Sequence, residues 1–207
     1  MKKLFLTLFL LIFCTPSWSE ILTMDNLVER NNLFYKKFTN VPFTGEVSGI
    51  ENGNIKNGRK NGEWVSYHKN GQLYTKGNWI HGKRDGLWEH YYPNGQLQYE
   101  VNYKNGKKDG LEEWYYENGQ LDLKENWKDG KLDGLAEFYY KNGQLQYKGN
   151  YKEWKEDGLW ESYHENGQLF IKNYNYKDGK KDGLFEYFYT DGSLEKIENW
   201  KDGVKQK

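Results

Sequence analysis

The sequence predicts an all-β protein, an elongated and curved antiparallel meander, or solenoid, built from stacked β-hairpins. The first observation is a 24-residue period: Asn-Gly-Gln-Leu returns at Asn70, Asn94, Asn118, Asn142 and Asn166. A constant period of about 20 to 50 residues marks a repeat architecture. The second is that each period holds two strand-forming runs separated by glycine turns. The third is composition: only 36% of residues are hydrophobic, so 9 Trp, 18 Tyr and 10 Phe must supply most of the burial.

The first 19 residues differ from the rest and predict a secretory signal peptide, residues 1–19. Lys2 and Lys3 precede an apolar run, and Ser17 and Ser19 follow as the two small residues of a cleavage site. The apolar run is too short to span a bilayer as a stable helix. We therefore expect cleavage after Ser19 and an exported protein, located in the periplasm, in the cell envelope or secreted.

Cys14 is the only cysteine, and cleavage after Ser19 would remove it. The mature protein would then contain no thiol and no disulfide, so its stability would not depend on a redox environment. In a lipoprotein, Cys14 would instead be the lipidated first residue, but Phe13 occupies the position where such signals carry a small side chain. Association with a membrane is therefore not expected unless Cys14 is lipidated.

The remaining chain divides into a cap and a repeat array. Residues 20–44 match no repeat and are expected to form an N-terminal cap, with a strand over residues 33–38. Residues 45–207 form the array, with five in-register repeats from about residue 62 and degenerate first and last units. A cap is expected because the outer edge of a terminal repeat is otherwise unpaired.

Each repeat is expected to be one hairpin. In the repeat over residues 86–109, Asn94-Gly95 separates the two strands, and this dipeptide is typical of a type I′ turn with positive φ at both residues. The second reversal, residues 81–86 and its equivalents, contains Asp and Gly and predicts a turn stabilised by the aspartate side chain. The chain would then pass directly from one hairpin into the next.

Two departures interrupt the period. Trp154 occupies the place of the turn glycine found at Gly82 and Gly130, and the last repeat contains one extra residue. An inserted residue reverses the alternation of a strand unless a bulge absorbs it. We therefore expect a β-bulge between Phe170 and Tyr176.

Alternation assigns side chains to the two faces of the sheet, because neighbouring strand residues point to opposite sides. Leu87, Glu89 and Tyr91 have counterparts in other repeats and are expected to form the packed scaffold. The intervening column varies between repeats and is expected to serve the surface. The candidate partner-binding residues assigned to this surface are Trp88, His90, Trp114, Phe138, Trp160 and Tyr187.

The pattern Tyr-Tyr-x-Asn-Gly-Gln-Leu, followed by Tyr-Lys-x-Gly-Lys-x-Asp-Gly, as over residues 91–110, resembles the bacterial variant of the MORN repeat. The lead-in over residues 25–45 resembles the YwqK-type family, whose members are often labelled antitoxins. The resemblance covers almost the whole mature chain and implies an extended sheet of stacked hairpins that acts as an interaction scaffold. The antitoxin label implies a cytosolic toxin partner.

Charge and motif content argue against several function classes. The 30 basic and 30 acidic residues cancel and are interspersed, so no nucleic-acid partner is expected. His68 and His164 occupy equivalent positions four repeats apart, too far to share a metal ion. The sequence shows no Ser-His-Asp, Cys-His or metal-ligand constellation. We therefore expect no catalytic residues, no cofactor and no metal, and the protein is not predicted to be an enzyme.

These observations predict an exported, non-catalytic repeat scaffold that binds an unidentified protein or a cell-surface ligand. One alternative is an antitoxin-like protein that neutralises a toxin partner. A further alternative is a carbohydrate- or choline-binding repeat protein. It arises because Trp114-Tyr115-Tyr116, before a glycine turn, is similar to repeats that hold cations or sugar faces in aromatic cages.

Overall fold

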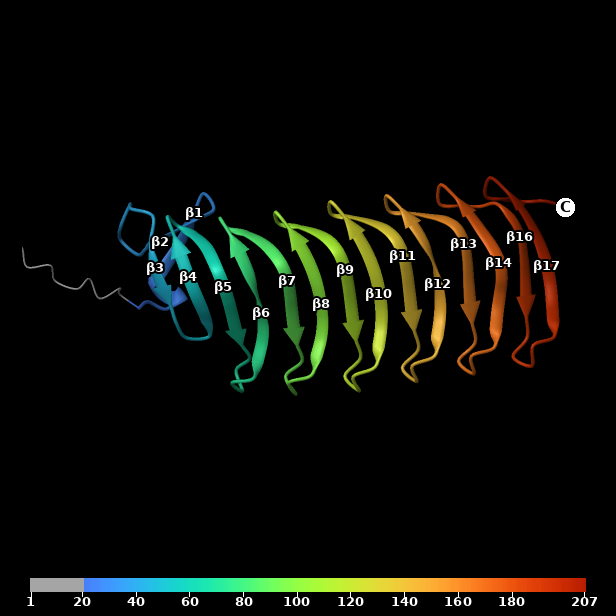
Figure 1. Cartoon of the computed structure of the whole chain (residues 1–207), viewed down its shortest axis with the longest axis horizontal. Coiled ribbons are helices and arrows are strands. Elements are labelled where there is room, and N and C mark those ends of the chain that lie inside the picture. Colours follow the sequence, from blue (N-terminus) through green and yellow to red (C-terminus); the bar gives the residue numbers. More distant parts are fainter. Residues whose placement is uncertain (1–20) are drawn as a thin grey trace, which may run out of the picture.

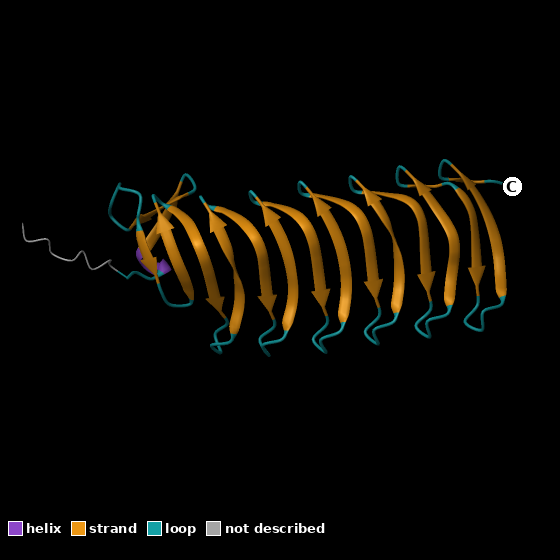
Figure 2. Cartoon of the chain, viewed as in Figure 1, coloured by secondary structure: helices purple, strands orange, loops and turns teal. Residues whose placement is uncertain are grey.

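The computed structural model describes residues 21–207 and shows one long antiparallel sheet with a small hairpin at its N-terminal end (Figures 1 and 2). The predicted signal peptide, including Cys14, lies outside the described residues. Figure 1 shows the bowed strands side by side in a single row, with the turns along two long edges. Because strands that follow one another in the chain are neighbours in the sheet, the predicted meander of hairpins is confirmed.

A short 3-10 helix, η1 (Met24–Asn26), precedes the small sheet formed by β1 (Leu27–Arg30) and β2 (Leu33–Lys36). The 16-stranded main sheet consists of β3 (Gly45–Val47), β4 (Glu51–Lys56), β5 (Arg59–Tyr67), β6 (Leu73–Ile80), β7 (Lys83–Tyr91), β8 (Leu97–Lys104), β9 (Lys107–Tyr115), β10 (Leu121–Lys128), β11 (Lys131–Tyr139), β12 (Leu145–Lys152), β13 (Lys155–Tyr163), β14 (Leu169–Lys177), β15 (Lys180–Lys181), β16 (Gly183–Phe188), β17 (Leu194–Lys201) and β18 (Val204–Lys205). In the described part of the chain, no helix is long and apolar enough to cross a membrane.

One long edge of the main sheet is formed by two-residue turns in which both residues have positive φ. His81 and Gly82 join β6 to β7 with φ of 51° and 79°. Such values define a type I′ turn, whose twist matches that of the flanking strands. Glu153 and Trp154 adopt the same geometry, with φ of 48° and 75°, although neither is glycine. Positive φ costs a non-glycine residue about 1–2 kcal/mol, so the Trp154 backbone is strained.

The opposite edge is formed by the Asn-Gly turns, and the prediction that they are type I′ turns is wrong. Gly95 has φ of 88°, whereas Asn94 is not among the described residues with positive φ. The Gly95 amide donates to the Tyr92 carbonyl and the Tyr92 amide donates to the Gln96 carbonyl, both at 2.8 Å. This pattern is a three-residue loop, a type I turn closed by a glycine bulge. The Asn94 side chain favours it by accepting the Gln96 amide at 2.9 Å.

The glycines that end the predicted reversals, Gly86, Gly110, Gly134 and Gly158, lie inside strands and not in turns. Gly86 has φ of 75° and lies in β7, where the register against β6 shifts between Lys76 and Asn78. A glycine at positive φ within a strand is typical of a β-bulge, which bends the strand and increases its twist. At this position of the repeat, Asp-Gly therefore marks a bulge next to the type I′ turn.

The bulge predicted from the extra residue in the last repeat is confirmed. Trp160 pairs with Tyr174, and Ser162 pairs with Ile171, so β14 contains one residue more than β13 between these two pairs. The bulge absorbs the insertion and restores the alternation of faces downstream.

Hydrogen bonds at both edges connect each repeat to the next. The Asn118 amide donates to the Lys141 carbonyl at 3.0 Å, one repeat further along the chain. At the type I′ edge, the Gly106 backbone amide donates at 2.8 Å to the carbonyl of Arg84, in the strand that follows the preceding turn. These bonds satisfy turn groups that the strand ladders leave free, so neighbouring repeats are joined at their edges as well as through the sheet.

The two faces of the sheet are buried to different extents, and the predicted assignment of faces is wrong. We call one the aromatic face; its central row is at most 3% exposed at each of Trp64, Trp88, Glu112, Ala136, Trp160 and Phe185. We call the other the leucine face; there Leu87 is 45% exposed and Leu159 is 63% exposed. The varying column is therefore packed, and the recurring leucine column faces solvent.

The central row of the aromatic face can vary between repeats, because a large side chain on one strand faces a small residue on the neighbouring strand. A Cβ atom on Gly77 would lie 2.3 Å from the ring of Trp88, so this indole fills the space above the glycine. Where the tryptophan is absent, the paired position is larger: Val101 faces Glu112 and Glu125 faces Ala136. Each pair of facing positions on adjacent strands is therefore closely packed, although the residue at either position varies between repeats. A comparison of equivalent positions in different repeats does not reveal this.

Candidate functional site

A ladder of stacked rings follows the Asn-Gly side of the aromatic face. The ring centroids of His90 and Tyr99 are 4.1 Å apart, as are those of Tyr99 and Trp114. Further along, Phe138 and Tyr147 stack at 4.2 Å. Stacking at these distances contributes about 0.5–1.5 kcal/mol per pair beyond burial, so the ladder stiffens the face.

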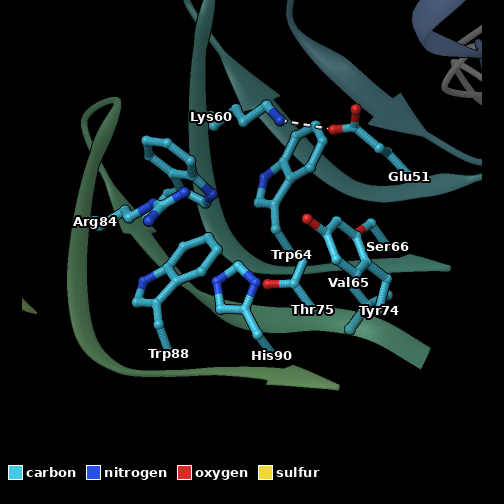
Figure 3. Close-up of a pocket in the computed structure, with 11 residues that line it drawn as sticks. Glu51, Lys60, Trp64, Val65, Ser66, Tyr74, Thr75, Arg84, Trp88 and His90 are labelled. Carbon is cyan, nitrogen blue, oxygen red and sulfur yellow. Dashed lines mark hydrogen bonds and ion pairs between the residues drawn. The ribbon is translucent and has the colours of Figure 1, made fainter. Parts of the chain in front are cut away.

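The ladder is interrupted at Leu123 and at Ser162, and it ends at β5 and β6, where Ser66 and Thr75 occupy the positions of the rings. These residues pair with each other, and Thr75 also pairs with His90 of β7. Because two small side chains replace two rings, a cavity of about 230 Å³ remains between the strands. Figure 3 shows Trp64, Trp88 and His90 gathered around it. This aromatic pocket is the candidate functional site.

A lysine and a glutamate lie at one side of the aromatic pocket. Lys60 Nζ is 2.7 Å from Glu51 Oε2 and 4.0 Å above the Trp64 ring. The ammonium group is therefore held by both a carboxylate and an aromatic face. The dashed line in Figure 3 marks the ion pair.

An arginine lies across the aromatic pocket from this pair. The Arg84 guanidinium is 4.5 Å above the Trp88 ring, and Nη1 donates to the Tyr103 hydroxyl at 3.1 Å. None of the carboxylates in residues 21–207 forms an ion pair with Arg84. The positive charge of the guanidinium is therefore not balanced by a carboxylate, and some of its N–H donors do not donate to one.

Unpartnered polar atoms cluster at the aromatic pocket. Seven buried side-chain polar atoms of the described residues have no hydrogen-bond partner, and four belong to residues that line this pocket. These four are Ser66 Oγ, Thr75 Oγ1, Trp79 Nε1 and His90 Nε2. A buried polar group without a partner costs about 1–3 kcal/mol, so these four atoms lower the stability of the region around the pocket.

His90 is a neutral side chain at neutral pH. Burial, and to a smaller extent the nearby Arg84 charge, lower the pKa of His90 to about 4. The ring is 6% exposed and stacks on Tyr99. One ring nitrogen can therefore accept a hydrogen bond while the other donates.

This shift predicts a loss of stability in mild acid. The unfolded chain binds a proton at His90 near pH 6.5 and the folded chain only near pH 4, so stability falls as the pH is lowered between these values. We expect a loss of about 3 kcal/mol that is absent in His90→Gln. Urea unfolding of both proteins at neutral pH and near pH 4 measures it, and an equal loss in both would contradict it.

The structure distributes the six sequence-predicted residues over three places. Trp88 and His90 line the aromatic pocket. Trp114 and Phe138 are half-buried in the ring ladder. Trp160 and Tyr187 are buried in a cluster at the C-terminal end. Trp88, His90, Trp160 and Tyr187 are therefore buried and are not the surface residues expected. Only Trp88 and His90 contribute to the pocket.

Sequence reasoning missed the residues that create the aromatic pocket. Ser66 and Thr75 carry no chemical signature of their own, and Arg84 lies in a turn segment rich in charge. The signal that was present is their position: both small residues stand where later repeats carry rings such as Tyr99 and Trp114. Two small side chains side by side in a row of rings predict a cavity once the face is known.

The leucine face is open along its length. Leu135 and Leu184 are 40% and 54% exposed, like Leu87 and Leu159. These leucines lie on alternate strands, opposite asparagines such as Asn102, which pairs with Leu87. The result is a row in which exposed leucines alternate with asparagines across the strands.

A row of charges runs beside this row of leucines. Lys76 and Glu89 pair at 2.7 Å, and Lys124 and Glu113 pair at 3.0 Å. Glu100 breaks the alternation, because it lies between Glu89 and Glu113 on the neighbouring strands. Burial raises the pKa of Glu100, and the hydrogen bond and charge of Glu113 raise it further.

Glu100→Lys is expected to stabilise the protein by about 1 kcal/mol, because it replaces two like-charge cross-strand contacts by two opposite-charge contacts. Thermal unfolding measures the gain as an increase in Tm. Lys124→Glu, which creates like-charge contacts in the same row, is the matched control and should lower Tm. An unchanged or lower Tm for Glu100→Lys would contradict the prediction.

His68 and His164, which occupy equivalent positions, contact backbone carbonyls of the next repeat. His68 Nε2 lies 2.8 Å from the Tyr91 carbonyl and His164 Nε2 lies 2.9 Å from the Phe188 carbonyl. In another repeat, the Tyr92 hydroxyl donates to the corresponding carbonyl at 2.9 Å. Within residues 21–207, no group of three His, Cys, Asp or Glu side chains is placed to hold a metal ion.

The fold and its two faces define a hairpin-repeat protein with a single open sheet. The family model described as MORN repeat variant matches six consecutive segments of the chain. They are residues 60–81, 84–105, 108–129, 132–153, 156–178 and 181–202. The protein therefore belongs to the MORN repeat variant family. No curated protein matches the chain, so the resemblance to YwqK-type antitoxins stays a prediction.

Two solved structures show partial similarity. One is the crystal structure of a GtfA/B complex bound to UDP and GlcNAc, with 15% identity over 54% of this chain and a TM-score of 0.23. The other is the crystal structure of accessory secretory proteins 1, 2 and 3 from Streptococcus pneumoniae, with 17% identity over 58% of this chain and a TM-score of 0.27. The chain spans 21% of the length of each, and such scores do not establish a shared fold.

Proposed function

We propose that the protein is an exported, non-catalytic repeat scaffold that docks a partner protein on its leucine face. The observation that carries the proposal is the regular row of exposed leucines that alternate with asparagines, with Leu159 63% exposed and Leu184 54% exposed. A row of this kind, bordered by a row of charges, offers apolar contacts together with a polar rim. MORN repeats generally mediate interactions with proteins or membranes, which agrees with this role.

Export is tested by the intact mass of the protein from fractionated native cells. A mass that begins at Glu20, in the periplasm or the medium, would support the proposal. A mass that begins at a lipidated Cys14 would place the scaffold on a membrane. An uncut chain in the cytosol would contradict export and favour the antitoxin alternative, with a toxin as the partner.

Docking is tested by site-specific crosslinking in the native cells. A photoreactive residue in place of Leu159 should crosslink one dominant protein. The same residue in place of the exposed turn residue Gln120 is the matched control and should not. Leu159→Glu should abolish capture of that protein while leaving Tm unchanged. Equal crosslinks from both positions would contradict docking on the leucine face.

A further inference from the structure

The type I′ edge contains an exposed Asn-Gly pair, Asn105-Gly106, with a chemistry of its own. Asparagine followed by glycine is prone to spontaneous deamidation, because glycine has no side chain to shield its amide nitrogen. That nitrogen attacks the asparagine Cγ atom. An N–Cγ bond forms, and the Cγ–Nδ2 bond breaks as ammonia leaves with the proton lost by the glycine nitrogen. Water then opens the cyclic imide to aspartate or isoaspartate.

Four of the Asn-Gly turns on the opposite edge hold both ends of the asparagine carboxamide. Asn118 Oδ1 accepts the Gln120 amide at 3.0 Å, and Asn118 Nδ2 donates to the Lys141 carbonyl at 3.0 Å. The same two bonds are made by Asn70, Asn142 and Asn166. The Cγ atom therefore reaches the next amide nitrogen only after both bonds break.

The carboxamide of Asn105 is not held in this way. Asn105 and Gly106 form the two-residue turn between β8 and β9, with φ of 52° and 84°, and both are exposed. The Asn105 backbone amide donates to Asp85 Oδ1 at 3.4 Å. Among residues 21–207, no hydrogen-bond partner holds the side-chain amide of Asn105. Its Cγ atom is therefore free to turn toward the Gly106 nitrogen.

The attacking nitrogen is bonded equally in both kinds of turn. The Gly106 amide donates to the Arg84 carbonyl at 2.8 Å, and the Gly119 amide donates to the Tyr116 carbonyl at 2.8 Å. Both turns must break this bond before the attack, so it does not favour either. The difference in reactivity therefore depends on the side chain of the asparagine.

The Asn-Gly pairs near the N-terminal end are restrained as well. Asn52 Oδ1 accepts the Gly49 amide at 2.7 Å. The glycine of Asn57-Gly58 is buried beneath the N-terminal cap. Asn61 lies within β5, where it pairs with β4. Asn105-Gly106 thus combines an exposed turn with an unbonded carboxamide.

The aspartate product fits the turn that contains Asn105. Asp129 and Asp178 occupy the equivalent position in later repeats, with φ of 50° and 52°, and each is followed by glycine. Conversion to aspartate therefore reproduces a turn that the protein already contains. Isoaspartate instead adds one backbone CH₂ group, which does not fit the closed two-residue turn.

We propose that Asn105 is a site of spontaneous deamidation in the folded protein, with loss of ammonia and formation of aspartate and isoaspartate. Asn118 and its equivalents are protected by the bonds of their carboxamides. This proposal is independent of the leucine face and of export, and it can fail while both succeed.

The test is incubation of the folded protein in mildly alkaline buffer, followed by peptide mapping with mass spectrometry. Asn105 should convert at least roughly tenfold faster than Asn118, because two hydrogen bonds must break at Asn118 and none at the Asn105 carboxamide. The chain unfolded in urea is the control. There the two residues should convert at similar rates, because the protecting bonds are absent.

Two variants test the role of the turn, and thermal melting verifies that each is folded. Asp129→Asn places an Asn-Gly pair in the equivalent turn between β10 and β11, and it should convert about as fast as Asn105. Asn105→Asp should abolish the product at this position and leave Tm unchanged.

Several outcomes would overturn the proposal. Equal rates at Asn105 and Asn118 in the folded protein would remove the protective role of the carboxamide bonds. An intact Asn105 in the folded protein, after a time that converts it in urea, would remove the site. An intact asparagine in folded Asp129→Asn would show that the type I′ turn is not what permits the reaction.

Discussion

Replacing Gly77 with valine is expected to lower the free energy of unfolding by about 3 kcal/mol, because overfilling a packed site forces the backbone or its neighbours to move. A Cβ atom at this position would lie 2.3 Å from Trp88 Cδ2 and 2.4 Å from Cε2. The indole is 3% exposed and its Nε1 donates to the Asn78 carbonyl at 3.1 Å, so it has little freedom to withdraw. Urea unfolding measures the loss.

The cause is tested by repeating the change in a Trp88→Ala background. There the valine has space, so Gly77→Val should be nearly neutral relative to Trp88→Ala alone. The difference between the two backgrounds is the coupling energy of the pair. The same loss in both backgrounds would show that backbone propensity, and not contact with the indole, determines the effect.

Replacing Trp160 with alanine is expected to cost about 3–5 kcal/mol, the usual range for removal of a buried tryptophan. Trp160 is 3% exposed and packs edge-on against Tyr151 at 5.2 Å and Tyr176 at 6.1 Å. Chemical denaturation followed by near-UV circular dichroism measures the loss. Leu159→Ala, its neighbour on the opposite face, is the matched control and should change stability by less than about 0.5 kcal/mol.

The loss in Trp160→Ala should also be local. Each repeat contacts only its neighbours, so stability is approximately a sum over adjacent repeats. Hydrogen exchange should accelerate in β13 and β14 while β7 and β8 remain protected. Uniform acceleration along the whole sheet would contradict this and indicate a single cooperative unit.

Much of the fold could be predicted because its signals are local and periodic. Glycine recurs at nearly every reversal of the chain, so the period and the hairpins are visible without knowledge of packing. The bulge in β14 was predictable for the same reason, since one extra residue must be absorbed somewhere in the strand. Turn types were not, because Asn94-Gly95 suits two loop geometries and only the length of the loop distinguishes them.

The choice of faces and the aromatic pocket could not be predicted from the repeats. Recurrence of Leu87 suggested a packed scaffold, but in a single sheet the packed row is defined by pairs such as Gly77 and Trp88 on adjacent strands. Register and ring placement decide these contacts, and neither is encoded in one repeat alone. The pocket forms because Ser66 and Thr75 have small side chains where other repeats carry rings. This can be recognised only once the neighbouring ladder of rings is known.

The strands run across the long axis of the molecule, and this arrangement has a mechanical consequence. A tension applied between the two ends would load the ladder bonds one strand pair at a time, as in a zipper, and not all together in shear. Each hairpin that opened would release a length of slack chain while its neighbours stayed folded. The protein would therefore extend in steps at low force, which is the behaviour of a compliant tether and not of a rigid strut.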